Sequence, residues 1–534
     1  MESQGSSRNS RPARPYALLV KETPKKIKST SGAQMKIFEK SKLMNNKNLI
    51  MWNEVDWNQT RHYLRRIQYR IYKAEQNQNH RLVIWLQKQL VQSKAARIMA
   101  VHQVTTLNKG RKTSGVDKQT ILSAREKARL AASICLNGTA NPIRRVWIPK
   151  PGKTQLRPLG IPTIRDRAKQ ALAKFALEPQ WEAKFEPNSF GFRPARRHYD
   201  AIEAIFSSLH YNRPKYVYDA DIEKCFDKIN HQALIEKLNT FPQMRKQVKA
   251  WLEAPVMDNV KGDDEQPTIN KQATPQGGVI SPLLANIALH GLEDHLKLHV
   301  AALKPPEGHS KRDKRRALGA IRYADDFVLI HRDKQILQSC ISETERWLKS
   351  IGLNTGKSEL RDGREGLNFL GFQVIQVRKK TADRYKVNMI PSKQAQKNVL
   401  EKAKQVMQHN KAASSYFLIK KLAPIIVGWA NYYKYCQCSK IFGKLDHVIF
   451  QKLRAWAFRR DTKHGRRVIK ENYFPSGKTY VYDGSKHQDN WVLVGKTKGH
   501  GDKIQENYLP RMSWIHSRKF VKVKGSKSPY DQLY

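Results

Sequence analysis

Two adjacent carboxylates, Asp325 and Asp326, interrupt an apolar run in GAIRYADDFVLIHRD. Neighbouring residues of a regular strand point to opposite faces, so both carboxylates can be exposed together only at a tight turn. The run therefore predicts a hairpin in which residues 321–323 enter, the aspartates form the tip and residues 327–330 leave. Acidic residues are also ordinary turn formers, so this pair alone does not separate a functional site from a solvated turn.

A second group of carboxylates follows another strand-like run, in KYVYDADIEKCFDKINH. Its candidates are Asp219, Asp221 and Asp227, and Asp221 lies at the end of the expected strand. Mg²⁺ typically takes one or two carboxylates together with phosphate oxygens and water. Two such ions can activate a hydroxyl and stabilise the leaving oxygen in phosphoryl transfer. The two groups therefore predict a Mg²⁺ site, and Mn²⁺ suits the same oxygen ligands.

The charge of the chain indicates what lies beside these carboxylates. There are 99 Lys and Arg against 46 Asp and Glu, a formal net charge of +53. Such an excess repels itself and favours a polyanionic partner. Nucleic acid is the first candidate and an anionic membrane the second, but no apolar run reaches the roughly 18 residues that a spanning helix needs. We therefore expect a nucleic-acid partner and no membrane.

The pattern of elements predicts an α+β fold. Residues 1–50 are expected to be a disordered basic leader, and residues 52–107 show helical spacing. Between residues 140 and 375, strand-like runs such as RRVWIPK and KYVYDADI alternate with helical ones, without a regular β-α-β repeat. Residues 391–460 are again helical, and residues 461–534 are basic and rich in Gly and aromatic residues, with little helical periodicity.

Several phrases, in a fixed order, resemble a known family. YADD, DADIEKCFDKI and TPQGGVISPLLANIALHGLE resemble reverse transcriptases. RRVWIPKPGKTQLRPLGIPTIRDRAKQALAKFALEP, FEPNSFGFRPARRHYDAI, GLNTGKSE, NFLGF and IVGWANYYKY narrow the resemblance to the reverse transcriptase and maturase proteins encoded by group II introns. The resemblance extends from about residue 52 to about residue 467 and continues more weakly to the end.

The resemblance implies a right-hand polymerase. Residues 51–390 would form the fingers and palm, residues 391–467 an α-helical thumb (maturase domain X), and residues 468–534 a basic DNA-binding region, after a leader of residues 1–50. Many relatives continue from an SPYD-like phrase into a His-Asn-His endonuclease with paired C-x-x-C motifs. This chain reaches Tyr534 without them, so we expect no endonuclease domain and no cleavage of the second DNA strand.

The resemblance also implies the catalytic set. Asp221, Asp325 and Asp326 match the polymerase aspartates. Asp221 and Asp325 would be the main metal ligands, with the backbone carbonyl of Ile222 as a further one.

Substrate contacts follow from the same resemblance. Lys150 and Arg157 would grip the incoming triphosphate, for which a guanidinium offers a bidentate fork and an ammonium a point charge. Phe226 would crowd the sugar 2′ position, and Gln276 would lie beside the nascent pair, with Ile222 in the same nucleotide site. Without the resemblance, the two cations could be ordinary surface charges, Gln276 a turn residue and Phe226 a core residue. The residues implied near the primer and template are Lys357, Gly371 and Arg193.

In the expected thumb, aromatic residues alternate with lysines. Trp429, Tyr432, Tyr433 and Tyr435 lie near Lys434 and two further lysines. This pattern suits RNA, whose bases stack on aromatic rings while cations hold its phosphates. The alternative is a helix core with a basic outer face, which we favour for Trp429.

Two functions remain open. The first is an RNA-directed DNA polymerase that uses two Mg²⁺ ions to copy intron RNA by target-primed reverse transcription, and that binds this RNA as a maturase in splicing and retrohoming. The second is an RNA-binding maturase with a silent palm. The complete set of aspartates favours the enzyme. A reverse transcriptase of phage defence or of a CRISPR system is disfavoured by the long thumb and basic tail.

Expected partners are group II intron RNA, target DNA and dNTPs. We expect a bacterial cytoplasm, with a plastid or mitochondrion as the alternative, and either a monomer or a dimer.

Overall fold

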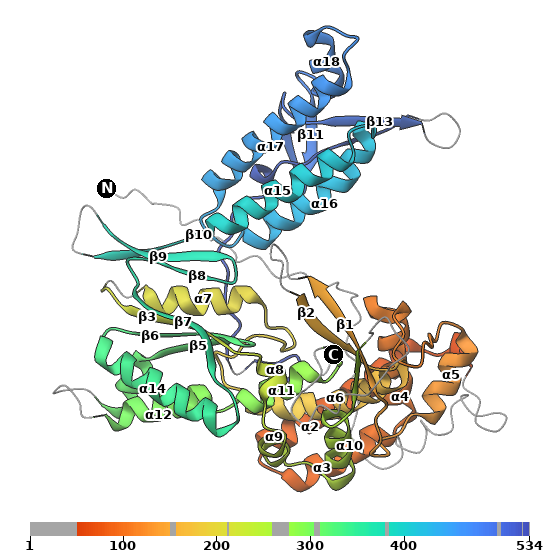
Figure 1. The fold of residues 1–534 in the computed structure, drawn as a ribbon, viewed down its shortest axis with the longest axis vertical. Helices are drawn as coiled ribbons and strands as arrows, with labels where there is room; N and C mark the ends of the chain where they lie inside the picture. Colours follow the sequence, from red (N-terminus) through yellow and green to blue (C-terminus); the bar gives the residue numbers. More distant parts are fainter. Residues whose placement is uncertain are drawn as a thin grey trace, which may run out of the picture.

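The computed structural model describes most of the chain from residue 51 onwards. The described residues are 51–149, 156–210, 213–258, 277–303, 310–379, 384–498, 504–525 and 527–532. The expected leader lies outside them. Figure 1 shows a wide body that carries the fingers and palm segments, and an arm of long helices that rises from it. In the part of the chain that is described, no helix is both long and apolar enough to cross a membrane.

One half of the body is built around a helix that is buried along almost its whole length, α6 (Ile164–Lys184). The side chain of Thr163 caps α6 by accepting a hydrogen bond from the backbone N–H of Asp166. Neighbouring helices bury apolar residues at helical spacing, as Leu64, Ile67 and Ile71 do. These helices are α2 (Trp57–Gln76), α3 (His80–Gln92), α4 (Lys94–His102) and α5 (Ala124–Ser133).

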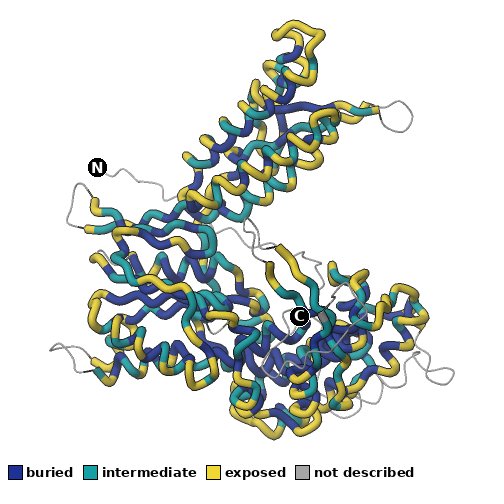
Figure 2. Tube along the Cα trace, in the orientation of Figure 1, coloured by how far each residue is buried: buried dark blue, intermediate teal, exposed yellow. Residues whose placement is uncertain are grey.

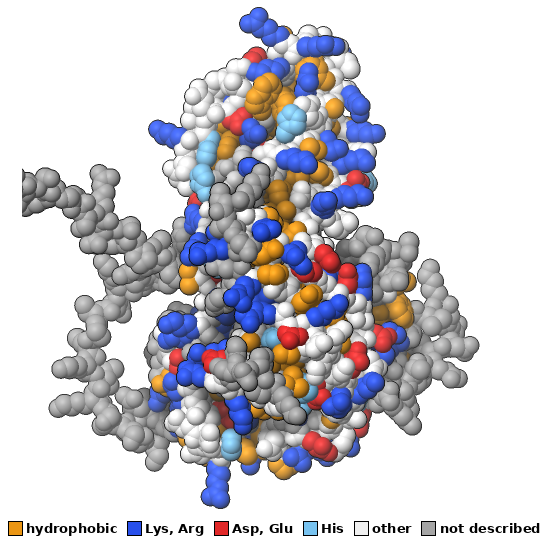
Figure 3. Space-filling view, turned by 90° about the vertical axis from the view of Figure 1, so that its left-hand side faces the viewer, with side chains coloured by type: hydrophobic (Ala, Val, Ile, Leu, Met, Phe, Trp, Pro, Cys, Tyr) orange, Lys and Arg blue, Asp and Glu red, His pale blue; other side chains and the backbone are white. Residues whose placement is uncertain are grey.

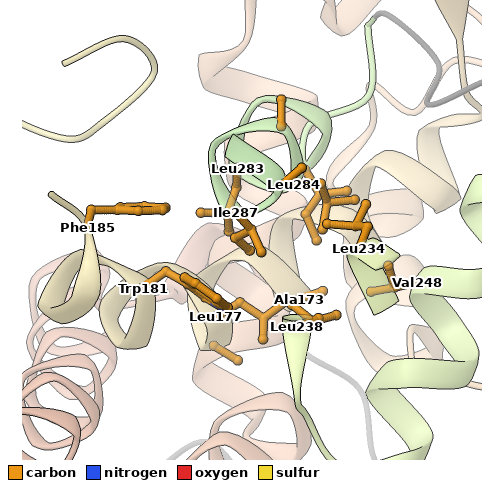
Figure 4. Close-up of a cluster of buried hydrophobic side chains, with 14 of the residues drawn as sticks. Ala173, Leu177, Trp181, Phe185, Leu234, Leu238, Val248, Leu283, Leu284 and Ile287 are labelled. Atoms are coloured by element: carbon orange, nitrogen blue, oxygen red, sulfur yellow. The ribbon is translucent and has the colours of Figure 1, made fainter. Parts of the chain in front are cut away.

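Further along α6, the core is closed by helices from the middle of the sequence. Figure 4 shows Leu177 and Trp181 of α6 facing Leu234, Leu238 and Ile287 from other helices. This packing joins segments that are distant in the chain, such as Trp181 and Ile287, which are separated by about 100 residues. The helices concerned are α9 (His231–Leu238), α10 (Pro242–Leu252) and α11 (Ser281–Leu289).

A fingers hairpin stands above this helical half. Strands β1 (Ile143–Pro149) and β2 (Leu156–Ile161) are antiparallel, and β4 (Val256–Asp258) joins β1 in parallel. Burial is greatest near the start of β1 and the end of β2, whereas the last residues of β1 (147–149) and the first of β2 (156–157) are exposed, as the yellow segments in Figure 2 show.

The other half of the body contains a four-stranded antiparallel sheet in the order β5-β6-β3-β7. Its side chains alternate between two cores. Val217 and Val328 face α7 (His198–Leu209), whereas Phe327 and Leu329 belong to the core that includes α12 (Leu292–Ala302) and α14 (Lys334–Ser350). The strands are β3 (Tyr216–Ile222), β5 (Gly319–Tyr323), β6 (Asp326–His331) and β7 (Thr355–Asp362).

A second antiparallel sheet links this half to the arm. It has the order β10-β9-β8, and its last strand runs directly into the first arm helix. Its strands are β8 (Leu367–Phe369), β9 (Phe372–Arg378) and β10 (Tyr385–Pro391).

The arm, residues 393–515, consists of helices and a small β unit. Its long helices are α15 (Lys393–His409), α16 (Ser415–Tyr433) and α17 (Ser439–Arg460). The region expected to show little helical periodicity begins with another helix, α18 (Arg466–Tyr473), and continues as two hairpins. The hairpin strands are β11 (Thr479–Tyr482), β12 (Ser485–Gln488), β13 (Val494–Lys498) and β14 (Ile504–Tyr508).

After the β unit the chain returns to the body. This strap, residues 516–525 and 527–532, reaches the fingers helices, where Asp531 pairs with Lys73 at 2.6 Å and the hydroxyl of Tyr530 donates to Glu178 at 2.7 Å. The mixed helices and strands confirm the α+β class predicted from the sequence.

Candidate active site

The predicted hairpin exists, and its turn contains two residues. Tyr323 pairs with Asp326, so Ala324 and Asp325 form the turn between β5 and β6. Ala324 has a φ of +60°, a conformation that places the first turn residue in the left-handed region. Asp325 therefore lies at the tip as expected, whereas Asp326 is the first residue of β6 and not a tip residue.

Buried polar groups hold this turn in place. The guanidinium of Arg322 donates to the carbonyl of Ala324 at 3.0 Å, to Oδ1 of Asn286 at 3.0 Å and to Oγ of Ser189 at 2.7 Å. Gly191 lies so close that an added Cβ would be 2.3 Å from the backbone nitrogen of Ala324. Sequence reasoning missed Arg322, although a charge inside an apolar strand run was a visible signal.

The third aspartate meets the hairpin through the sheet. Asp221, near the end of β3, pairs directly with Asp326. The backbone N–H of Ile222 donates to the carbonyl of Asp325 at 3.1 Å. On the other side of β3 the pairing with β7 shifts between Ala220 and Ile222. The structure thus brings Asp221, Asp325 and Asp326 close to one another and to the backbone of Ile222.

The carboxylates are crowded and partly buried. Burial, together with the negative charges of Asp325, Asp219 and Asp221, raises the pKa of Asp326 to about 7. Burial also raises the pKa of Asp219 to about 6. Like charges in a site of low polarity disfavour ionisation, so this group of acids needs a compensating positive charge to be fully ionised.

A divalent cation would supply that charge, and the donor atoms fit one. Oδ1 of Asp221 is buried and accepts no hydrogen bond from any described residue, which is costly for a carboxylate oxygen unless a cation is bound. Carboxylate and carbonyl oxygens are the ligands that Mg²⁺ prefers. Within the described ranges no three His, Cys, Asp or Glu are grouped as a ready-made cage.

An aromatic pair lies next to the aspartates. Phe226, in the short helix α8 (Cys225–Lys228), is buried, and Phe192 contacts it edge to face with ring centroids 6.3 Å apart. Phe192 is half exposed and has a φ of +59°. Sequence reasoning named Phe226 but missed Phe192, whose signal was an aromatic residue between Gly191 and Arg193.

Comparison with known proteins identifies the family. Residues 148–374 match the model of the reverse transcriptase (RNA-dependent DNA polymerase), and residues 52–134 match the N-terminal domain of reverse transcriptase. Residues 396–474 match the group II intron maturase-specific domain. Protein YkfC of Escherichia coli (strain K12) is 31% identical over 331 residues, which cover 55% of this chain and 84% of that protein.

The chain belongs to the group II intron-encoded reverse transcriptase and maturase family. Two further relatives agree. The group II intron-encoded protein LtrA of Lactococcus lactis subsp. cremoris is 34% identical over 192 residues, which cover 35% of this chain and 31% of that protein. Maturase-like protein 1 of Euglena gracilis is 26% identical over 408 residues, which cover 73% of this chain and 79% of that protein.

The residues expected to hold the incoming triphosphate are only partly described. Arg157 lies on β2, exposed, and pairs with Ile148. Burial raises the pKa of Asp227, whereas the positive charges of Arg145 and Arg157 lower it. Both arginines therefore lie close enough to Asp227, on the short helix α8, to affect its ionisation. Lys150 and Gln276 lie outside the described residues.

Two of the three residues expected near the primer and template, Lys357 and Gly371, lie in the palm and at its border with the thumb. Lys357 is exposed on β7, beside Asp219. Gly371, with a φ of +81°, forms with Leu370 the two-residue turn of the β8–β9 hairpin. A Cβ at Gly371 would lie 2.6 Å from the hydroxyl oxygen of Tyr433 on α16, so this turn is where the palm side contacts the thumb.

Arg193 has internal partners in the fold. It was expected near the primer and template, but its guanidinium is buried and forms a bidentate pair with Glu182, with both distances 2.9 Å. It also donates to the carbonyls of Glu186 and Ser189. The arginine therefore fixes the segment after α6 and has no free donor edge for nucleic acid.

The thumb tyrosines also have internal partners in the fold. Tyr432 stacks on His198 of α7 with ring centroids 3.9 Å apart and an angle of 8°. Tyr433 is buried, and Tyr435 packs against Tyr199 and Phe520. These rings join the thumb to the palm and the strap, so they are not available to stack on RNA bases. Trp429 is in the thumb core, as favoured from the sequence.

Proposed function

We propose that this chain is an active RNA-directed DNA polymerase that copies intron RNA by target-primed reverse transcription, and that it also binds this RNA as a maturase. The observation that carries the proposal is the convergence of Asp221, Asp325 and Asp326, with a buried oxygen of Asp221 left without a partner. A silent palm would not need to retain three crowded acids whose burial is unfavourable.

In this proposal the chain's residues have distinct tasks. Asp221, Asp325 and the carbonyl of Ile222 hold two Mg²⁺ ions, which when bound stabilise the charge that develops during phosphoryl transfer. Lys150 and Arg157 bind the triphosphate of the incoming dNTP, and Gln276 lies beside the nascent pair. Phe226, supported by Phe192, excludes a 2′-hydroxyl, and Lys357 contacts the primer strand.

The maturase part of the proposal rests on charge. The matched maturase-specific domain lies in a chain with a net charge of +53, and phosphate contacts of Lys and Arg release counterions. RNA affinity should therefore fall steeply with salt. We assign the binding of target DNA to residues 468–515, because the strap residues already form contacts with the body.

The test is primer extension on an RNA template with purified protein, dNTPs and Mg²⁺. The wild type is compared with Asp325→Ala and with Glu401→Ala, a matched loss of an exposed acid on α15. We expect extension to disappear only in Asp325→Ala, while splicing of the intron is retained in all three proteins. A folded, RNA-binding wild type that extends no primer would instead identify a maturase with a silent palm. Parallel loss of splicing in Asp325→Ala would contradict the separation of the two activities.

A further inference from the structure

A cavity far from the palm aspartates lies near the outer part of the arm. It has a volume of about 670 Å³ and is lined by residues of α17 and α18, together with Trp491 and Arg511 of the β unit. Cavities of roughly 300–1,000 Å³ are typical of small-molecule sites. Among the described residues no Asp or Glu lines it. Figure 3 shows exposed hydrophobic side chains among Lys and Arg on the upper part of the molecule, which is the arm.

Aromatic rings form one part of the cavity lining. Phe450 packs edge to face on the buried Phe474, with centroids 5.4 Å apart, and on Trp491, with centroids 4.9 Å apart. Trp491 is 51% exposed, and no other aromatic ring of the described chain covers it. Exposing an indole to water in a recess forfeits burial of a large apolar surface. Trp491 is thus half exposed beside Lys470, whose Nζ lies 6.0 Å from the centroid of the indole ring.

The cations of the lining fall into two groups. Arg511 is held by Asp489 at 2.5 Å, and Lys470 by Glu471 at 2.8 Å. In contrast, Arg454, Arg466 and Arg467 are exposed and form no ion pair with any described residue. The first group fixes the shape of the cavity, and the second leaves three guanidinium groups available to an anion.

We propose that this cavity binds one unstacked nucleotide of a single-stranded nucleic acid. The base lies against Trp491 and Phe450, and the adjoining phosphates lie on Arg454, Arg466 and Arg467. Rings beside guanidinium groups that form no ion pair with described residues are the chemistry that holds single strands, and the exposed arginines of the lining favour an anionic ligand. The proposal deepens the RNA binding proposed above and rests on that function only for the source of the nucleotide.

The base contact is tested with fluorescent eight-nucleotide RNA and DNA single strands of one sequence. Trp491→Ala is compared with Trp85→Ala, which removes a similarly exposed indole from α3. We expect affinity to fall about tenfold in Trp491→Ala, as for one lost stacking contact, and to stay unchanged in Trp85→Ala. Photocrosslinking with a 4-thiouridine or 4-thiothymidine strand should modify Trp491 or Phe450. Equal affinities in the two variants, with no crosslink in the cavity, would overturn the proposal.

The phosphate contact is tested by charge. The double variant Arg466→Gln, Arg467→Gln is matched by Arg315→Gln, Arg316→Gln, an equal loss of charge on α13 (Lys311–Ala317). We expect the slope of log affinity against log salt to become shallower by about 1.4 only in the first pair, since each single-strand phosphate contact contributes about 0.7. Equal slopes would overturn the assignment of phosphates to these arginines.

Competitors separate the ligand classes. Tighter binding of either the RNA or the DNA strand supports the site, and the strand that binds more tightly identifies the source of the nucleotide. A duplex of the same sequence should compete poorly, because its bases are stacked, and equal competition by the duplex or by poly-glutamate would overturn a nucleotide site. Primer extension is run in parallel. Its failure in the wild type would contradict the proposed polymerase, while strand binding at Trp491 would stand independently.

Discussion

Gly356 and Asp221 face each other across strands β7 and β3 so closely that a Cβ at Gly356 would lie 2.6 Å from Oδ1 of Asp221. The backbone of Gly356 does not have a positive φ, so the glycine is needed for space and not for its conformational freedom. The atom it makes room for is the end of a rotatable side chain. An added methyl group would therefore displace the carboxylate and leave the strands in place.

Gly356→Ala should lower the rate of primer extension by about 10- to 100-fold, because a misplacement of about 1 Å at a reacting centre has such an effect. RNA affinity and the thermal midpoint should stay close to those of the wild type. Single-turnover extension and thermal unfolding measure the two quantities. The control is Gly428→Ala on α16, where an added Cβ meets nothing within 4 Å. Wild-type extension by Gly356→Ala would show that the position of Asp221 tolerates this shift.

Phe226→Ala should admit ribonucleotides. Removing the ring opens space beside the aspartates where the sugar would lie, and such a pocket discriminates by roughly 10- to 200-fold. We expect the ratio of kcat/KM for rNTPs to that for dNTPs to rise about tenfold or more. Phe192→Ala should raise the ratio less, since it removes only the support of Phe226. An unchanged ratio in both variants would mean that Phe226 is a core residue.

The sequence predicted the strands that carry the aspartates because their signals are local. Short apolar runs beside the carboxylates indicated β3 and the β5–β6 hairpin, and the structure contains both. It did not determine which residues form the two-residue turn, because YADD allows more than one register. Pairing of Tyr323 with Asp326 settles this in the fold, so only one of the two adjacent aspartates is at the tip.

Residues whose role depends on distant partners could not be assigned from the sequence. Arg193 finds Glu182 only after the chain turns at the end of α6, and Tyr432 finds His198 across 234 positions of sequence. The strap has little periodicity of its own, because its contacts are made by single residues and backbone groups. In each case the partner, and not the residue type, decides between a ligand contact and an internal one.

Arg196→Met should release the strap. The Arg196 guanidinium donates to four strap carbonyls, those of Val523, Lys524, Gly525 and Lys527, at 2.7–3.2 Å. Hydrogen bonds from a charged group each contribute about 1.5–3 kcal/mol, and several share one side chain here. We expect a loss of about 2–4 kcal/mol in the free energy of unfolding and faster trypsin cleavage after Lys519, Lys522 and Lys524.

The control for the strap is Arg197→Met, which removes the neighbouring exposed arginine. Both proteins are digested with trypsin under native conditions, and cleavage sites are mapped by mass spectrometry. Equal cleavage rates in the two variants would contradict the role of Arg196. Loss of Lys73 pairing with Asp531 should affect only the last residues of the strap.

Acid should weaken the contact between palm and thumb through His198. Burial against the thumb, helped by the charge of Arg197 and opposed by a hydrogen bond with the backbone of Tyr432 and by the charge of Asp200, lowers the pKa of His198 to about 4. In the unfolded chain the pKa is about 6.5. Between pH 6.5 and 4 the unfolded state therefore binds a proton that the folded state does not.

Stability is unaffected above pH 6.5 and falls as the pH falls toward 4. A shift of this size corresponds to at most about 3 kcal/mol, and we expect about 1–2 kcal/mol because the ring is partly exposed.

His198→Phe keeps a ring against Tyr432 without a titrating group, so denaturant unfolding of the two proteins from pH 7.5 to 4 isolates the effect. The wild type should lose about 1–2 kcal/mol more than His198→Phe over this range. His464→Phe, which changes an exposed arm histidine beside Asp461, should follow the wild type. Parallel profiles of the wild type and His198→Phe would show that the histidine is already protonated or solvated in the fold.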